Sequence, residues 1–221
     1  MPSNSSDLTA QRVYAKLRED ILNGEREPGT RLGEMALCKE FNVSRGPVRA
    51  ALSLLAEAGI LTIVPHSGAS VRVISREDAR ALYEVRAALE SEAASLAAAA
   101  IGPNTAEQLR DLLLEHTRQV KFHPTGAYVQ TKKSSDFHLV VARLSDNPVL
   151  LHYLSKELYP QMALLRSRHK HVQGRGLTAL KEHQRIAEAI LEGDSEVAGI
   201  LMRRHINISW ESFESQLDVS G

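Results

Sequence analysis

Three histidines in the second half of the chain could do metal chemistry together. His138, His183 and His205 each lie at helical spacing from aliphatic residues, on what the pattern predicts to be the inner faces of three separate helices. A single histidine on an apolar face is more often an ordinary core side chain. Three buried imidazoles that converge from different helices can hold a zinc ion and leave one coordination position open.

The remaining histidines lack such apolar company. We interpret those of the second half of the chain as surface or ordinary partly buried side chains; they are His116, His123, His152, His169 and His171.

Two arginines, Arg45 and Arg49, have side chains that can recognise a base pair. Arg45 and Arg49 are four residues apart and share one face of a predicted helix, with Gly46 between them. A guanidinium group can bind guanine at two points, and a glycine allows the backbone to approach DNA closely. Ser44 can cap this helix, and the free amides of its first turn can hold a phosphate.

The elements around these arginines form a small ordered set. The patterns predict helices over residues 11–23, 33–41 and 45–58, and strands over residues 61–64 and 69–73, separated by a turn. Cys38 falls on the inner face of the second helix and is predicted to lie in the core. Together these elements describe a helix-turn-helix followed by a wing, the kind of unit that places its third helix in the major groove.

A domain boundary is expected near residue 75, where the pattern becomes purely helical. We predict a flexible amino terminus over 1–8, a winged helix-turn-helix domain over 9–74 and an all-α domain over 75–221. The second domain should contain six helices, with Pro160 kinking the fourth. Their predicted ranges are 76–101, 105–122, 126–144, 148–170, 177–192 and 195–216. The fold class is therefore mainly α, a winged helix-turn-helix followed by a six-helix bundle.

Composition limits the remaining classes of function. The 221 residues carry 27 Lys+Arg and 27 Asp+Glu, so neither a polybasic tail nor a disordered acidic chain is present. The single cysteine cannot form an internal disulfide, and no apolar run is long enough to cross a membrane. We therefore expect a cytoplasmic protein without membrane contact.

The amino-terminal residues carry a resemblance to a known family. The stretch "LCKEFNVSRGPVRAALSLLAEAGIL" followed by "PHSGASVRV" resembles the winged helix-turn-helix domain of GntR-type bacterial transcription regulators. This implies a homodimer on a palindromic double-stranded DNA operator, with Arg45 and Arg49 on bases or phosphates. It also implies that Gly68 enters the minor groove, with His66 and Arg72 as wing contacts. Some members carry a further DNA-contacting arginine where this chain has Met35.

The carboxy-terminal residues are similar to the FadR C-terminal effector domain, and to its six-helix VanR subgroup. The segments "ALYEVRAALESEAASLAA", "DFHLVVARLSDNPVLL", "EHQRIAEAILEGD" and "MRRHI" carry this resemblance. Many relatives bind a divalent ion through three histidines and an aspartate four residues before the first of them. That position is Ser134 here, and Asp136 would lie about 200° away around a helix, which is the wrong side for a ligand.

The resemblance implies a metal held by His138, His183 and His205, with zinc first and nickel or manganese as alternatives. Ser134 could hold a water molecule beside it. The resemblance also singles out Arg86, whose fork would bind a small organic acid between itself and the metal. The alternative for Arg86 is a weak pair with Glu90 on the same helix.

These features predict a DNA-binding transcription regulator, most simply a repressor, whose effector domain binds a metal and a small carboxylate. It is not expected to be an enzyme. One alternative is a metal-dependent hydrolase with an attached DNA-binding module, because an open metal position could activate water. That alternative lacks a catalytic carboxylate, since Glu182 is expected to point to a different face. The other is a metal-free regulator whose helical domain serves only for dimerisation.

Overall fold

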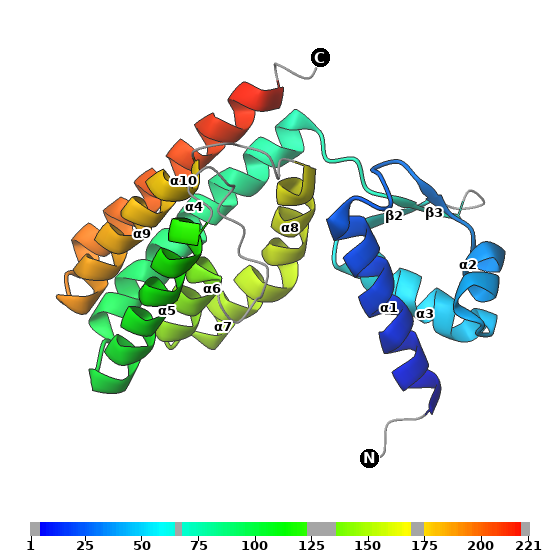
Figure 1. Cartoon of the computed structure of the whole chain (residues 1–221), viewed down its shortest axis with the longest axis horizontal. Helices are drawn as coiled ribbons and strands as arrows, with labels where there is room; N and C mark the ends of the chain where they lie inside the picture. Colours follow the sequence, from blue (N-terminus) through cyan, green and yellow to red (C-terminus); the bar gives the residue numbers. More distant parts are fainter. Residues whose placement is uncertain (1–4, 65–67, 123–135, 169–174, 218–221) are drawn as a thin grey trace. The chain divides into compact units, whose positions relative to one another are not determined.

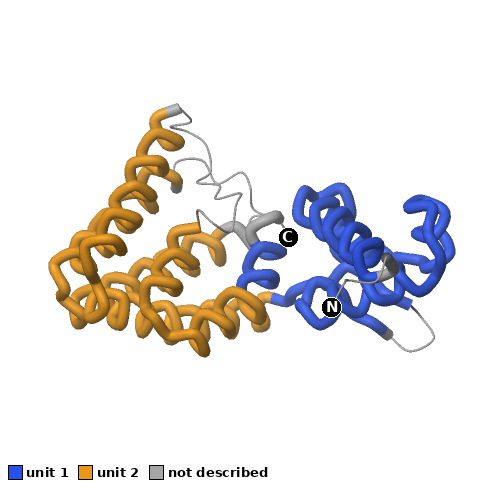
Figure 2. The backbone as a smooth tube through the Cα atoms, turned by 90° about the horizontal axis from the view of Figure 1, so that it is seen from below, with its two compact units in different colours: residues 1–75, 159–168 blue, residues 76–158, 169–221 orange. Residues whose placement is uncertain are grey.

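The structure is a computed structural model, and it describes residues 5–64, 68–122, 136–168 and 175–217 of the chain (Figure 1). The chain divides into two compact units, coloured separately in Figure 2. The first unit comprises residues 1–75 together with 159–168, and the second comprises residues 76–158 and 169–221. The helix over residues 159–168 therefore belongs to the first unit, because most of its contacts lie there.

The first unit is built on three helices. Helix α1 spans Ser5–Asn23, α2 spans Glu34–Phe41 and α3 spans Arg45–Glu57. Helix α1 packs on α3, and Val13, Leu17 and Ile21 are buried at every fourth position as the sequence predicted. The helix begins at Ser5, so residues 5–8 are helical, whereas the prediction placed its start at Gln11. Ala10 and Asp20 are buried as well.

A tight turn joins α2 to α3. Asn42 adopts the left-handed conformation with φ 53°, and its amide donates to the carbonyl of Cys38. Asparagine tolerates this conformation better than most residues, which explains how the two helices can be joined by three residues. Ser44 holds the N-cap position of α3 in an extended conformation, but its side chain makes no capping hydrogen bond, contrary to our expectation. Cys38 is half-buried and not part of the closed core.

The wing is a three-stranded antiparallel sheet, in the order β1-β3-β2. Strands β2 (Leu61–Val64) and β3 (Gly68–Val71) form the predicted hairpin, with Leu61 paired with Val71. The two-residue strand β1 (Arg31–Leu32) pairs with β3 and was missed from the sequence. Two residues carry no periodicity, so only their pairing with a distant strand reveals them.

The second unit is helical. Helices α4 (Arg76–Ala99) and α10 (Ser195–Leu217) pack along each other. Gly199 lies at this contact, where a Cβ atom would come within 3.3 Å of the Ser91 carbonyl oxygen, so a glycine lets the two backbones approach. Its other elements are α5 (Pro103–Phe122), α6 (Phe137–Leu144), α7 (Pro148–His152), a π-helix over Tyr153–Leu158 and α9 (Arg175–Leu191). Helix α8 (Tyr159–Arg168) follows the π-helix in the chain and is the helix that belongs to the first unit.

Two predicted helices differ from the structure. The helix predicted over residues 126–144 begins only at Phe137, because Asp136 has extended backbone angles and caps it; residues 126–135 lie outside the described part of the chain. The helix predicted over 148–170 contains a π-helical segment that ends two residues before Pro160. Proline cannot donate to the preceding turn, so the regular hydrogen-bond pattern breaks at this point.

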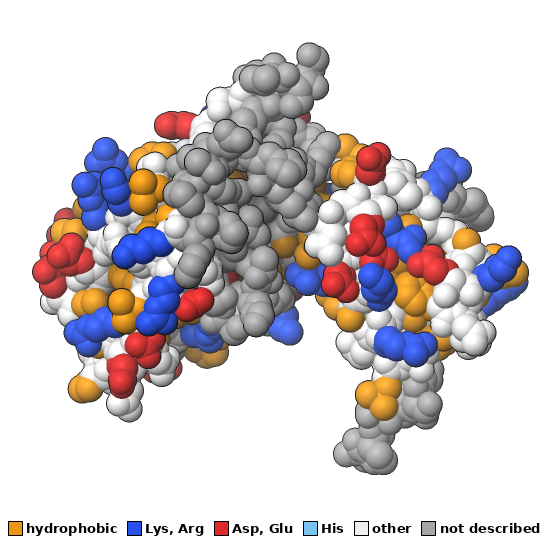
Figure 3. Space-filling view, viewed as in Figure 1, with side chains coloured by type: hydrophobic (Ala, Val, Ile, Leu, Met, Phe, Trp, Pro, Cys, Tyr) orange, Lys and Arg blue, Asp and Glu red, His pale blue; other side chains and the backbone are white. Residues whose placement is uncertain are grey.

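The surface matches the balanced composition. Figure 3 shows acidic and basic side chains interspersed over the described parts of the visible face. None of the described helices combines the length and apolarity that a membrane span requires.

The cap of α6 gives a direct test of this local structure. The Asp136 carboxylate is buried and accepts hydrogen bonds from the amides of His138 (3.0 Å) and Leu139 (3.2 Å). We expect Asp136→Ala to lower the free energy of unfolding by about 1–2 kcal/mol, because both amides lose their acceptor. Asp136→Asn keeps an acceptor oxygen and should recover most of that loss. Urea denaturation measures both, and equal stability of the two variants would contradict the capping role.

Candidate functional site

The first turn of α3 presents the residues predicted to read DNA. Ser44, Arg45, Gly46 and Arg49 are all exposed, whereas Pro47 and Val48 between them are buried. Arg49 Nε lies 3.0 and 2.9 Å from the two carboxylate oxygens of Glu34 on α2. The structure therefore places both arginines together on one exposed helix face, with the buried side of the helix held against α1 and α2.

Met35, which stands where some family members have an arginine, is exposed on α2 beside this face. Arg45 Nη2 lies 3.1 Å from its sulfur atom. The thioether carries no charge, so this position offers no phosphate contact of its own.

The predicted wing residues have different surroundings. Gly68 begins β3 with φ 81°, a conformation that a side chain would strain, so the glycine is required by the turn. Arg72 is only partly exposed, and its Nη1 donates to Gln161 Oε1 at 2.8 Å. His66 lies outside the described residues.

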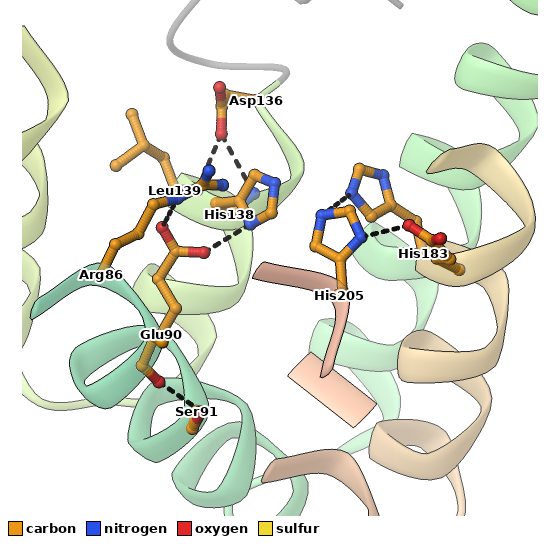
Figure 4. Close-up of polar contacts among 10 residues, drawn as sticks. Arg86, Glu90, Ser91, Asp136, His138, Leu139, His183 and His205 are labelled. Atoms are coloured by element: carbon orange, nitrogen blue, oxygen red, sulfur yellow. Dashed lines mark hydrogen bonds and ion pairs between the residues drawn. The ribbon is translucent and has the colours of Figure 1, made fainter. Parts of the chain in front are cut away.

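The three predicted histidines are brought together in the second unit. His138 lies on α6, His183 on α9 and His205 on α10, and all three are buried. One ligand nitrogen from each lies within 4.8 Å of the other two. Figure 4 shows the three imidazole rings facing one another. The sequence prediction that these helices bring their histidines together is thus confirmed.

The closest pair of nitrogens has the spacing of two ligands on one ion. His183 Nε2 and His205 Nε2 are 3.2 Å apart. Nitrogens bound at about 2.0–2.1 Å to a tetrahedral zinc ion lie about 3.3–3.4 Å from each other. Phe137 supports this arrangement, because its ring stacks on His183 with centroids 4.0 Å apart. The residues therefore fit a divalent ion.

Glu182 lies at the site, which the sequence analysis did not expect. Its Oε2 is 2.6 Å from Nδ1 of His205, although Glu182 is on α9 and His205 on α10. An ionised carboxylate only accepts hydrogen bonds, so Nδ1 of His205 must carry the proton. Consecutive residues of a helix point about 100° apart, so Glu182 was expected to point away from the site of His183. Its side chain instead extends to α10 and contacts His205 there.

A buried chain of charged groups adjoins His138. Arg86 Nε donates to Glu90 Oε1 at 2.6 Å, and Glu90 Oε2 lies 2.6 Å from His138 Nδ1 (Figure 4). The Arg86–Glu90 pair, which the sequence offered as a weak pair within one helix, is present and both its side chains are buried. Glu90 Oε2 and His138 Nδ1 are both buried and lie against each other, so this carboxylate contacts the ring of His138.

Burial keeps the imidazoles of His183 and His205 uncharged. It lowers the pKa of His205 to about 4, and the hydrogen bond that His205 donates to Glu182 opposes this shift only in part. Burial also lowers the pKa of His183 well below its usual value, and the neighbouring His205 and His138 add to this effect. A neutral imidazole has the free lone pair that a metal requires.

Glu90 is the charged partner in this group. Burial raises the pKa of Glu90, but Arg86 and then His138 outweigh that effect, so the pKa lies below its ordinary value and the side chain is ionised.

Two further interpretations are revised. His116 is only 1% exposed and close enough to lower the pKa of His183, so it is a buried neighbour of the site. Asp136 caps α6 from outside the helix, so the argument that placed it 200° around that helix does not apply; its Oδ1 is occupied by two backbone amides. Ser134 lies outside the described residues.

Comparison with known proteins agrees with both halves of the chain. Residues 9–71 match the model "Bacterial regulatory proteins, gntR family", and residues 81–208 match the FCD domain. The chain belongs to the GntR family of transcriptional regulators with an FCD domain.

Several relatives and solved structures resemble the chain over most of its length. YdhC, an uncharacterized HTH-type regulator of Bacillus subtilis, is 30% identical over 94% of this chain and 92% of its own. The repressor RspR of Escherichia coli is 32% identical over 65% of this chain and 62% of its own. The structure of E. coli McbR/YncC has a TM-score of 0.75 at 21% identity, covering 95% of this chain and 98% of that one, which shows a shared fold.

These matches identify the class of protein. The matching families and the relatives named above are transcriptional regulators, so the chain is a DNA-binding regulator and not an enzyme. The hydrolase alternative is set aside on this ground.

The histidine cluster predicts a measurable metal content. Protein purified without added metal or a histidine tag should contain close to one equivalent of a divalent ion, and His138→Ala should lose it because one of three ligands is gone. The control is His152→Ala, which removes an exposed histidine of α7. Elemental analysis by mass spectrometry compares the three proteins. Equal metal content in the wild type and His138→Ala would contradict this ligand set.

Proposed function

We propose that this regulator is a homodimeric, metal-containing repressor that releases or tightens its hold on a palindromic operator when a small organic acid binds. The convergence of three buried imidazoles, with the buried Arg86–Glu90 pair beside one of them, carries this proposal. RspR, which is 32% identical over about two thirds of this chain, is named a repressor, and that supports the sign of regulation.

The metal would be held by His138, His183 and His205 and is most simply zinc, with nickel or manganese as alternatives. Three nitrogen ligands leave a position on the ion for an oxygen atom of a bound carboxylate. Ser134, where relatives have an aspartate, contributes no negative ligand. The vacant position is then open to the effector.

Arg86 is the second anchor for the effector. Its guanidinium is buried and paired with Glu90, and Glu90 in turn contacts His138, so the arginine and the histidines form one continuous polar cluster. An anion entering this cluster could bind the ion through one oxygen and the arginine through others. This geometry favours small acids with two or more oxygen atoms that can bind the ion and the arginine.

DNA recognition would rest on α3 and the wing. Arg45 and Arg49 would contact bases or phosphates, Ser44 a phosphate, and Gly46 would permit close approach. Gly68, His66 and Arg72 would provide wing contacts, with Arg72 first leaving its bond to Gln161. A homodimer presents two such helices, which matches the symmetry of a palindrome. Binding of the effector would favour one arrangement of the two DNA-binding domains over others.

The DNA-reading residues can be tested without knowing the operator. Selection from a random pool of duplexes should enrich a palindrome for the wild-type protein. Arg45→Ala and Arg49→Ala should each weaken binding to that duplex by about 1–3 kcal/mol, roughly 5- to 150-fold. Arg80→Ala, which removes an exposed arginine from α4, is the control. Fluorescence anisotropy gives the affinities, and wild-type affinity in both α3 variants would contradict the proposed surface.

The effector proposal predicts that small carboxylates stabilise the metal-loaded protein. In a thermal unfolding screen of di- and tricarboxylates, at least one should raise the melting temperature of the wild type, since a ligand of the folded state stabilises it. Arg86→Ala should abolish this response. Arg86→Lys keeps a positive charge beside Glu90 and hence the fold, but loses the two-point fork, so it should also respond poorly. A full response in both variants would refute the role of Arg86.

A further inference from the structure

Glu182 on α9 contacts one of the three histidines on a different helix, His205 of α10. The residue lies directly before His183 in sequence, yet its carboxylate is 2.6 Å from Nδ1 of His205 on α10. Its side chain is 17% exposed, whereas that of His205 is 4% exposed. Glu182 therefore lies at the edge of the cluster, with His205 between it and the other two histidines.

The chemistry of this contact determines which nitrogen of His205 is available. Because the carboxylate accepts the proton of Nδ1, the lone pair of the neutral ring is on Nε2. Nε2 is also the atom that faces His183, at 3.2 Å. In the absence of an ion, the same logic requires His183 to donate from its own Nε2 to His205. For both Nε2 atoms to hold an ion, the proton on Nε2 of His183 would have to move to its Nδ1, whereas His205 already has its lone pair on Nε2.

We propose that Glu182 is a positioning residue of the metal centre, which holds His205 in the tautomer and orientation that present Nε2 to the ion. This inference rests on the proposed metal-binding function and assigns a role that the ligand histidines alone do not provide. A carboxylate behind a metal-bound imidazole also increases its basicity as a ligand.

The charge of the site gives a second reason for this role. The ligand set of His138, His183 and His205 is neutral, and Ser134 offers no carboxylate to offset the two positive charges of the ion. Glu182 places negative charge one imidazole away, behind His205, whereas the charge of Glu90 behind His138 is already paired with Arg86. A carboxylate behind a histidine ring would thus offset part of the charge of an ion bound on the other side of that ring.

Glu90 makes a contact of the same length with His138, but it is the less suitable residue for a test. Its other oxygen is bound to Arg86, so replacing Glu90 changes two contacts and leaves a buried arginine uncompensated. Glu182 is partly exposed, and its replacement by glutamine keeps the size of the side chain while removing its charge.

The experiment measures the zinc affinity of the full chain by competition with a chromophoric chelator, after the resident metal has been removed. Glu182→Gln should bind zinc about 10- to 100-fold more weakly than the wild type. The matched control is Glu188→Gln, an exposed glutamate on the same helix, which should bind as the wild type does. Cobalt absorption spectra of the same proteins report the geometry of the site and should change only in Glu182→Gln.

Thermal unfolding of the metal-free proteins separates positioning from a purely structural role. A positioning residue predicts equal melting temperatures for metal-free wild type and Glu182→Gln, with a difference only when zinc is present. Wild-type zinc affinity in Glu182→Gln would overturn the inference and leave the metal centre standing. A weakened affinity accompanied by an equally destabilised metal-free protein would overturn it in favour of a structural contact. If the wild type itself bound no zinc, the proposed metal centre would fail together with the inference.

Discussion

The interior of the helical domain must provide partners for a group of polar side chains that are buried among apolar ones. Three histidines, one arginine and one glutamate are buried where α4, α6, α9 and α10 approach one another. Burial makes a charged imidazole costly, so the rings of His183 and His205 remain neutral. The charges of Arg86 and Glu90 are kept in this interior as a pair. A divalent ion would satisfy the nitrogen atoms that the apolar packing has brought together.

The proposed metal and effector site would act on several helices of the bundle at once. Each histidine comes from a different helix, so an ion bound by all three ties those helices together, and a ligand bound to the ion and Arg86 would change how firmly they are held. Two carboxylates, Glu90 and Glu182, contact the outer nitrogens of two of the rings and restrict their orientation. The DNA-binding unit needs no comparable internal chemistry, because the residues proposed to read DNA are exposed on a helix that is fixed by aliphatic packing against α1.

The parts of this structure that follow from local patterns could be predicted from the sequence. The helix-turn-helix, the β2–β3 hairpin and the grouping of His138, His183 and His205 all rest on periodicity, turn residues and a strong family resemblance. The same reasoning failed where a long-range contact decides the outcome. Strand β1 exists only through its pairing with β3, and Glu182 joins the site only because α10 brings His205 within its reach.

Helix boundaries failed for a related reason. Asp136 looked like part of a long helix, yet its side chain satisfies two amides of the helix that follows, which requires an extended backbone at that position. Hydrophobic periodicity does not distinguish a residue inside a helix from one that caps it. His116 was likewise misjudged, because its burial depends on its neighbours in the folded bundle and not on its local sequence.

The central claim is that the three histidines bind one metal ion through their ring nitrogens. X-ray absorption at the zinc edge of the purified, zinc-loaded protein tests this claim most directly. The account predicts a first shell of three imidazole nitrogens at about 2.0–2.1 Å, with the remaining position filled by oxygen. A first shell containing sulfur, or one composed of oxygen with at most a single imidazole, would contradict it.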